Sequence, residues 1–212
     1  MCGRFALHPT LTEAQQAYGI DRDAAAVLEA SDDIRPTTEV ATVLGGAERT
    51  ARRMRWGFVP DWYAGPEDGP LIINARSETI AQKPAFAEAC RQRRCLIPMS
   101  GFYEWQAVPG RGKRVHWLAP AEGGLHAFAG IWQVWCDEEG AARASCAIVT
   151  CAAPEALSHI HARLPVAILP EDYALWLGEA GHGAATLMRP PPDGWWEVTP
   201  DRGPPPERPR LL

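Results

Sequence analysis

The sequence predicts an α+β protein with a single domain, built on a largely antiparallel, barrel-like β-sheet with short flanking helices. The β-rich runs outnumber the helical ones, they do not alternate with them, and no internal repeat is present. With 212 residues, 46% of them hydrophobic, the chain is long enough to bury one core without disulfides. We expect the domain to span residues 1–200 and a disordered, proline-rich tail to follow at 201–212.

The expected helices are short and their ends are marked by specific residues. Thr10 begins the capping box Thr-Leu-Thr-Glu, which predicts a helix that ends at Gly19. Pro84 is a favourable first residue for a second helix that runs to Arg91. Brief helical segments are expected at 154–159 and 170–177.

The expected strands are rich in aromatic and β-branched residues. They lie at residues 40–44, 53–59, 95–97, 101–105, 114–118, 127–135, 144–150 and 195–198. We expect a break around Pro98 between the third and the fourth. The glycine- and proline-rich stretch 61–70 reads as a loop, which suits the rim of a site.

The composition limits which binding partners and which cellular compartment we expect. The net charge of −5 argues against a general nucleic-acid coat, although arginines cluster at 52–55 and 91–94 and leave room for a local basic groove. No apolar run approaches the roughly 20 residues of a membrane span. We expect a cytoplasmic monomer without a secretory signal or membrane contact. The six cysteines are then thiols, and without a Cys-x-x-Cys pair no metal or other cofactor is expected.

The second residue, Cys2, could provide a reactive group that no internal cysteine can. Removal of the initiator methionine would place a free α-amine beside its thiol, and such a 1,2-aminothiol closes onto an aldehyde as a thiazolidine. The α-amine titrates at about 7.7–8.0 against about 10.4 for lysine, so far more of it is neutral at pH 7. The alternative is an ordinary second residue.

An apolar strand at residues 72–73 runs into a block of polar side chains. Asn74 could fix an amine or a phosphate, and Arg76 could bind a phosphate in a bidentate manner. The alternative is a purely structural role for this segment, as a strand, a turn and a helix cap, with Ser77 or Thr79 as the capping residue.

Glu104 lies between two aromatic residues in a β-like run. In a strand it shares a face with Phe102, so it is either a buried acid–base group or, on a half-solvated sheet, an exposed glutamate.

A further polar segment contains His159, His161 and Arg163. His161 is a candidate general acid or base beside a phosphate-binding Arg163. A structural histidine is the alternative. The two histidines would share a face of an extended segment, but the cysteine spacing gives a metal site no support.

A series of motifs in fixed order carries a family resemblance. They are Met1-Cys2-Gly3-Arg4-Phe5, Trp56-Gly57-Phe58-Val59-Pro60, Asn74-Ala75-Arg76-Ser77-Glu78-Thr79, Lys83-Pro84-Ala85-Phe86, Arg94-Cys95-Leu96-Ile97-Pro98, Gly101-Phe102-Tyr103-Glu104-Trp105 and Ile160-His161-Ala162-Arg163-Leu164-Pro165. Together the motifs resemble the SOS-response-associated peptidase (SRAP) family of abasic-site processing proteins. The resemblance reaches from the first residue to about Leu177.

The resemblance implies a groove for single-stranded DNA and a thiazolidine between the N-terminal cysteine and the ring-opened aldehyde of an abasic site. It makes Cys2 the nucleophile, supported by Asn74 and Glu104, with His161 completing the site. The residues expected to bind DNA are Arg4, Trp62, Arg76, Ser77, Thr79 and Arg163. One departure stands out: Asp33 replaces a common asparagine and adds negative charge where DNA would pass.

These residue types suit that chemistry. Opening the sugar ring needs an acid, for which Glu104 is the candidate, and His161 suits the later proton transfers. Asn74 would orient the amine, and Trp62 could stack in the gap left by the missing base. Two rival functions remain open. One is an N-terminal-nucleophile peptidase, which would include self-removal of Met1. The other is a non-covalent single-strand binder, which the negative net charge disfavours.

Overall fold

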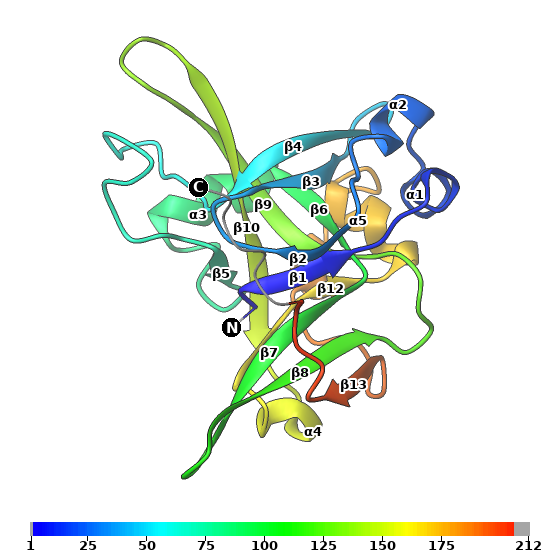
Figure 1. Cartoon of the computed structure of the whole chain (residues 1–212). Helices are drawn as coiled ribbons and strands as arrows, with labels where there is room; N and C mark the ends of the chain where they lie inside the picture. Colours follow the sequence, from blue (N-terminus) through cyan, green and yellow to red (C-terminus); the bar gives the residue numbers. More distant parts are fainter. Residues whose placement is uncertain (1, 206–212) are drawn as a thin grey trace, which may run out of the picture.

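The fold is organised around a closed barrel of five strands (Figure 1). The computed structural model describes residues 2–205. Around the barrel, each strand pairs with the next in the order β3 (Glu39–Leu44), β4 (Thr50–Trp56), β10 (Ala142–Ala152), β9 (His126–Cys136) and β6 (Arg94–Met99). Only the β4–β10 contact is parallel; the other four are antiparallel. The predicted fold class is therefore confirmed.

A second sheet crosses one side of the barrel. Its strand order is β13 (Trp196–Pro200), β8 (Gly112–Pro120), β7 (Gly101–Val108), β1 (Arg4–Leu7) and β2 (Ser31–Ile34). β7 and β8 form a long hairpin that projects from the body of the protein (Figure 1). Three shorter strands extend the barrel sheet: β5 (Asn74–Arg76) and β11 (Arg163–Pro165) flank the end of β10, and β12 (Ala167–Ile168) pairs with β9.

The helices are short, as expected. α1 (Leu11–Tyr18) has the predicted capping box, and Gly19 ends it in the left-handed region at φ 64°. α3 (Pro84–Gln92) starts at the predicted proline. The others are α2 (Arg22–Ala25), α4 (Glu155–Ser158), α5 (Tyr173–Leu177) and the 3₁₀ segments Pro170–Asp172 and Ala184–Leu187.

Aromatic rings join the second sheet to the barrel. Phe5 of β1 lies edge-on to Trp56 and Phe128, with ring centroids 5.2 and 5.7 Å apart. Phe102 of β7 also meets Phe128. Fully buried rings of this kind contribute heavily to core stability. They fix the start of β1, and with it Cys2, against the barrel core.

Three boundary predictions are wrong. The strand expected at 53–59 ends at Trp56, because Gly57 adopts φ 149°. The break around Pro98 is absent: Pro98 lies inside β6, and Ser100 separates β6 from β7. Proline is tolerated there because β3 pairs with β6 only at Leu96, so that edge is free at Pro98. The helix expected at 170–177 is split into a 3₁₀ turn and α5.

The C-terminal segment is described only in part. Residues 206–212 of the predicted tail lie outside the described residues. Before them, Asp201 accepts two hydrogen bonds from Arg114, and the guanidinium of Arg202 lies 4.9 Å from the ring centre of Trp117. Within residues 2–205, no helix has the length and apolarity needed to cross a membrane.

Candidate functional site

Cys2 and Asn74 are brought together at the N-terminal end of β1. Cys2 is fully buried, and its carbonyl oxygen accepts a 3.0 Å hydrogen bond from Nδ2 of Asn74. Asn74 is placed by the parallel pairing of β5 with β10, where it lies opposite Ile148. The indole of Trp56 donates to the carbonyl of Ile73 at 2.9 Å and so fixes the start of β5.

Glu104 is buried beside this pair. It is 2% exposed and lies on the same face of β7 as the fully buried Phe102, so the exposed-glutamate alternative is wrong. One carboxylate oxygen accepts a 3.1 Å hydrogen bond from the backbone N–H of Trp105. A buried carboxylate at a site is a candidate for acid–base work.

The thiol of Cys2 is held in its neutral form. Burial raises the pKa of Cys2 well above its ordinary value, and the negative charge of Glu104 raises it further. A backbone hydrogen bond at Arg4 acts in the opposite direction but is the weaker influence. At neutral pH the side chain is therefore a thiol rather than a thiolate.

His161 is fixed at the start of β11. Its Nδ1 lies 3.0 Å from the backbone nitrogen of Arg163 and 3.1 Å from the carbonyl oxygen of the same residue. The preceding carbonyl of His159 accepts a 3.1 Å hydrogen bond from Gln106, two residues beyond Glu104 on β7. The loop with His161 is thereby attached to the strand that contains Glu104.

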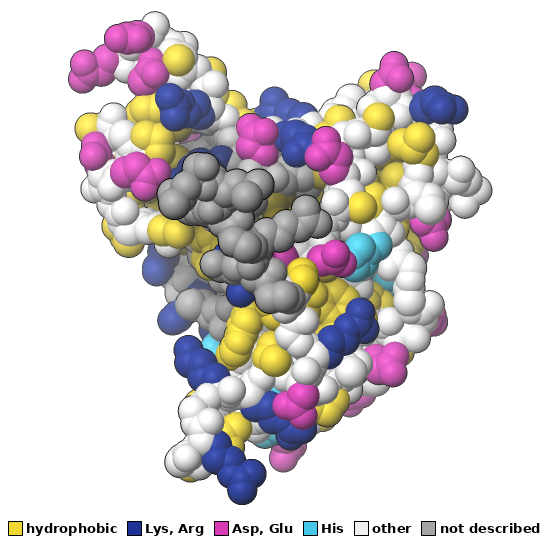
Figure 2. Space-filling model, in the orientation of Figure 1, with side chains coloured by type: hydrophobic (Ala, Val, Ile, Leu, Met, Phe, Trp, Pro, Cys, Tyr) yellow, Lys and Arg dark blue, Asp and Glu magenta, His cyan; other side chains and the backbone are white. Residues whose placement is uncertain are grey.

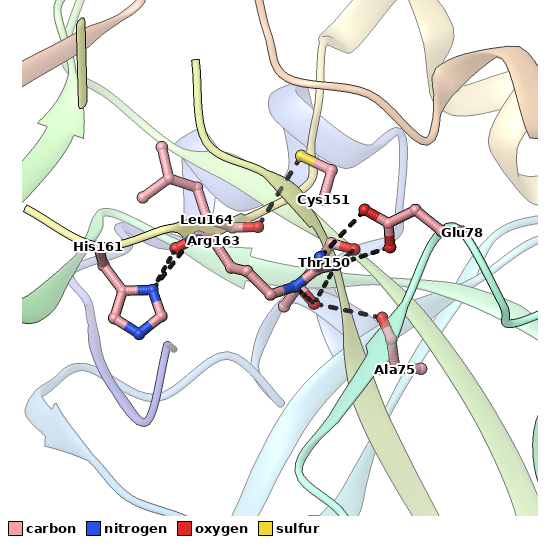
Figure 3. A network of polar contacts seen from close by, with 7 residues as sticks. All are labelled: Ala75, Glu78, Thr150, Cys151, His161, Arg163 and Leu164. Carbon is pink, nitrogen blue, oxygen red and sulfur yellow. Dashed lines mark hydrogen bonds and ion pairs between the residues drawn. The ribbon is translucent and has the colours of Figure 1, made fainter. Parts of the chain in front are cut away.

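The predicted phosphate-binding Arg163 already has a carboxylate partner. Its guanidinium donates to both oxygens of Glu78, at 3.0 and 2.9 Å, and to the carbonyl of Thr150 at 2.7 Å (Figure 3). The hydrogen bond from Arg163 lowers the pKa of Glu78. In Figure 3 the His161 ring points away from this pair. Sequence reasoning missed Glu78, although it follows Arg76 by two residues in the same motif.

Arg4 has the same kind of partner. Its Nε and Nη2 donate to the two oxygens of Asp33 at 2.7 and 2.6 Å, and Arg35 adds a third hydrogen bond at 2.7 Å. The negative charge of Asp33, which lies on β2, is thus paired with two arginines. A bidentate pair of this kind holds the guanidinium in one orientation.

The other side chains predicted to bind DNA differ in their solvent exposure. Arg76 is exposed on β5 opposite Thr150. Ser77 and Thr79 belong to a turn, and neither caps α3, whose N-cap is Lys83. Trp62 is 59% exposed in the loop at 61–70, which is tied to β9 by a hydrogen bond from the Trp135 indole to the carbonyl of Tyr63.

The remaining cysteines and histidines do not gather around a common point. Among residues 2–205, no group of three or more His, Cys, Asp or Glu side chains is arranged to hold a metal ion. Cys146 packs in the barrel core and Cys151 in the other core cluster, as their five-residue spacing predicts for opposite faces of a strand.

Known proteins resemble this chain over most of its length. The sequence profile of the SOS response associated peptidase (SRAP) family matches residues 1–201. The abasic site processing protein YoqW of Bacillus subtilis is 31% identical over 179 residues, which cover 84% of this chain and 80% of YoqW. The abasic site processing protein HMCES of Mus musculus is 32% identical over 178 residues, which cover 68% of this chain and 50% of HMCES.

The fold has solved relatives as well. A crystal structure of a protein from Bacteroides thetaiotaomicron superposes with a TM-score of 0.84 and covers 95% of this chain and 92% of its own. Its sequence identity is 21%, so this likeness concerns the fold alone. The profile match spans the whole described barrel and every residue of the site above. The chain therefore belongs to the SOS response associated peptidase family.

Proposed function

We propose that this protein recognises abasic sites in single-stranded DNA and links to them covalently through Cys2 once Met1 has been removed. The adduct would shield the lesion in the DNA damage response. The observation that carries the proposal is the position of Cys2, whose carbonyl is held by Asn74 and whose thiol lies close enough to the buried Glu104 for its charge to act on it. The names of the curated relatives support the abasic-site role.

The first step joins the α-amine of Cys2 to the aldehyde carbon of the open sugar. Glu104 would take the proton of the hemiacetal hydroxyl and pass it to the ring oxygen as the ring opens, and the carbinolamine formed with the amine then loses water to give an imine. Among the described residues, Oδ1 of Asn74 is buried without a hydrogen-bond partner. It is suited to accept a hydrogen bond from the amine and so to orient it.

The second step closes the thiazolidine ring. The sulfur adds to the imine carbon, and the thiol proton ends on the ring nitrogen, so the overall reaction releases one water. Because the thiol is neutral at pH 7, a proton must move as sulfur attacks. Glu104 is the nearby carboxylate that could transfer it, and His161 is the second candidate.

A peptidase is the second candidate function, and the Cys2 environment disfavours it. Cysteine peptidases attack with a thiolate, which forms because a neighbouring positive charge lowers the pKa of the thiol. Here burial and Glu104 raise the pKa of the Cys2 thiol. A site with these residues is better suited to amine chemistry than to thiolate attack on an amide.

The test uses single-stranded DNA with one abasic site and detects an adduct that survives denaturing electrophoresis. We expect the wild type and Cys90→Ala to form it and Cys2→Ala to form none. Cys90 is a matched control, because it is also a buried thiol but lies on α3 in the other core cluster. An adduct in Cys2→Ala would overturn the proposal. A passive binder would form no adduct in any variant, and high salt would release it.

A further inference from the structure

The tip of the β7–β8 hairpin is basic and solvent-exposed. Val108 pairs with Gly112 at the last register position, and the turn requires glycine because Gly110 and Gly112 have φ values of 72° and 81°. Arg111, Lys113 and Arg114 are all exposed. Figure 2 shows Lys and Arg side chains at the lower end of the molecule, where Figure 1 places this turn. In a chain with a net charge of −5, this is a local concentration of positive charge.

An open groove of about 700 Å³ runs along this hairpin, lined by Gln106, Arg111, Lys113, Arg114 and Asp201, with two valines. Asp201 is the only acidic residue in the lining, and it is already paired with Arg114 at 2.7 Å. Within residues 2–205, the side chains of Arg111 and Lys113 make no hydrogen bond or ion pair. Two positive charges of the groove therefore have no acidic partner among residues 2–205.

The groove and the candidate site share strand β7. Gln106 lines the groove and lies two residues beyond Glu104 on β7. Its amide nitrogen donates to the carbonyl of His159, and its oxygen lies 2.9 Å from Nε2 of His116. Val108 is four positions beyond Glu104, which is about 13 Å along a strand. A stacked nucleic-acid strand advances about 3.4 Å per nucleotide, so the tip is about four nucleotides from the lesion.

We propose that the β7–β8 hairpin binds the phosphodiester backbone of the same DNA strand, beginning about four nucleotides from the abasic site on one side. This inference rests on the proposed function, because it takes the lesion to lie at Cys2. The opposite charge at the β9–β10 turn supports it: Asp137, Glu138 and Glu139 there would repel DNA. The two turns project from different ends of the molecule (Figure 1), so the field would orient an approaching strand.

The test measures non-covalent binding as a function of strand length and salt. The probe is single-stranded DNA with a tetrahydrofuran analogue of the abasic site, which has no aldehyde and cannot crosslink. Strands of about 3 and about 15 nucleotides are compared, since only the longer one reaches the hairpin. The variant is Arg111→Gln/Lys113→Gln. The matched control, Arg22→Gln/Arg189→Gln, removes the same charge from exposed positions on α2 and after the second 3₁₀ segment.

We expect the hairpin variant to lose affinity for the long strand and to show a smaller salt dependence. Two lost phosphate contacts reduce the slope of log Kd against log salt by about 1.4, which makes the change in Kd between about 50 and 200 mM salt about sevenfold smaller. The short strand should bind the variant and the wild type alike, and the control should match the wild type.

Two results would overturn the inference: an equal loss for both strand lengths, or an equal loss in the control variant. Two further strands have their extra nucleotides only 5′ or only 3′ of the analogue. One of the two should bind the wild type as tightly as the long strand does. If the length effect is found but natural abasic DNA forms no adduct through Cys2, the crosslinking proposal fails and the hairpin contact stands. If the adduct forms and the length effect is absent, the hairpin inference alone fails.

Discussion

The side-chain amide of Asn74 donates a 3.0 Å hydrogen bond to the carbonyl oxygen of Cys2, which lies 72 residues earlier in the chain. This contact joins β5, at the end of the parallel pairing with β10, to the segment that leads into β1. Cys2 is thereby positioned from both sides, by the barrel core and by Asn74. A reactive group held in this way would lose little freedom when a substrate binds.

Replacing Asn74 with aspartate should slow adduct formation while leaving the fold intact. Aspartate has the same size, but its carboxylate oxygen would face the Cys2 carbonyl and cannot donate to it. An unsatisfied buried polar group costs about 1–3 kcal/mol, which corresponds to a rate reduction of about 5- to 150-fold if the loss appears in the transition state. Single-turnover gel assays measure the rate. An unchanged rate with an unchanged melting temperature would remove Asn74 from the site.

Glu104→Gln should lower the rate of adduct formation by about a hundredfold or more and leave DNA binding unchanged. Glutamine keeps the shape of the side chain and can accept the hydrogen bond from the Trp105 N–H, but it cannot transfer a proton. Glu197→Gln, an exposed position on β13, is the control and should react like the wild type. Loss of binding to the non-reactive tetrahydrofuran strand in Glu104→Gln would indicate a structural role instead.

Much of the fold was predictable because its signals are local. The alternation of Phe102 and Glu104 with Tyr103 and Trp105 allowed a buried glutamate, and the capping box at Thr10 placed α1. A barrel-like sheet was expected, but the strand pairings that close it were not visible, because they include a parallel contact of two residue pairs between β4 and β10 and a single pair between β3 and β6. Pairing between distant segments depends on tertiary packing rather than on the local pattern.

In the candidate site, too, local features were predictable from the sequence and contacts between distant residues were not. The motifs predict Cys2, Asn74 and Glu104 as site residues, and the structure brings these three together. They did not reveal that Arg163 is paired with Glu78, 85 residues away, or Arg4 with Asp33, 29 residues away. A sequence gives the charges on each segment but not which charges meet. Any phosphate bound by these arginines must share them with carboxylates.

Trp62→Ala should weaken non-covalent binding to single-stranded DNA by about 1–3 kcal/mol, the usual contribution of one stacked base. The fold should be unaffected, because the side chain is 59% exposed. Trp62→Phe keeps an aromatic face and should retain most of the affinity. Fluorescence anisotropy with the tetrahydrofuran strand measures both variants, and equal affinities for alanine and wild type would exclude Trp62 from the interface.

Gly130→Ala should destabilise the barrel. A Cβ at this position would lie 2.7 Å from the sulfur of Cys95 and 2.9 Å from Ile97, in a fully packed interior. Overpacking of this kind costs about 1–3 kcal/mol, or a decrease of about 2–12 °C in melting temperature for a chain of this size. Gly65→Ala is the control, since its nearest neighbour is 3.5 Å away. Thermal denaturation followed by circular dichroism should show the decrease only for Gly130→Ala.

Asp33→Asn should lower stability at neutral pH, and this difference should disappear in acid. Burial raises the pKa of Asp33, but hydrogen bonds and charges from Arg4 and Arg35 outweigh it, so the pKa lies below its ordinary value of 3.8. A lowered pKa in the folded state means that the stabilisation is complete above the unfolded pKa and is lost as the pH falls from about 4 through the lower folded value. We expect a difference of about 1 kcal/mol between variant and wild type at pH 7, allowing for solvent screening, and convergence only once the pH is below the lowered pKa of Asp33 in the folded state. Urea unfolding at several pH values measures this, and a difference that grows in acid would contradict the ion-pair assignment. The same variant should bind single-stranded DNA more tightly at low salt, because it removes a carboxylate that competes with phosphate for Arg4.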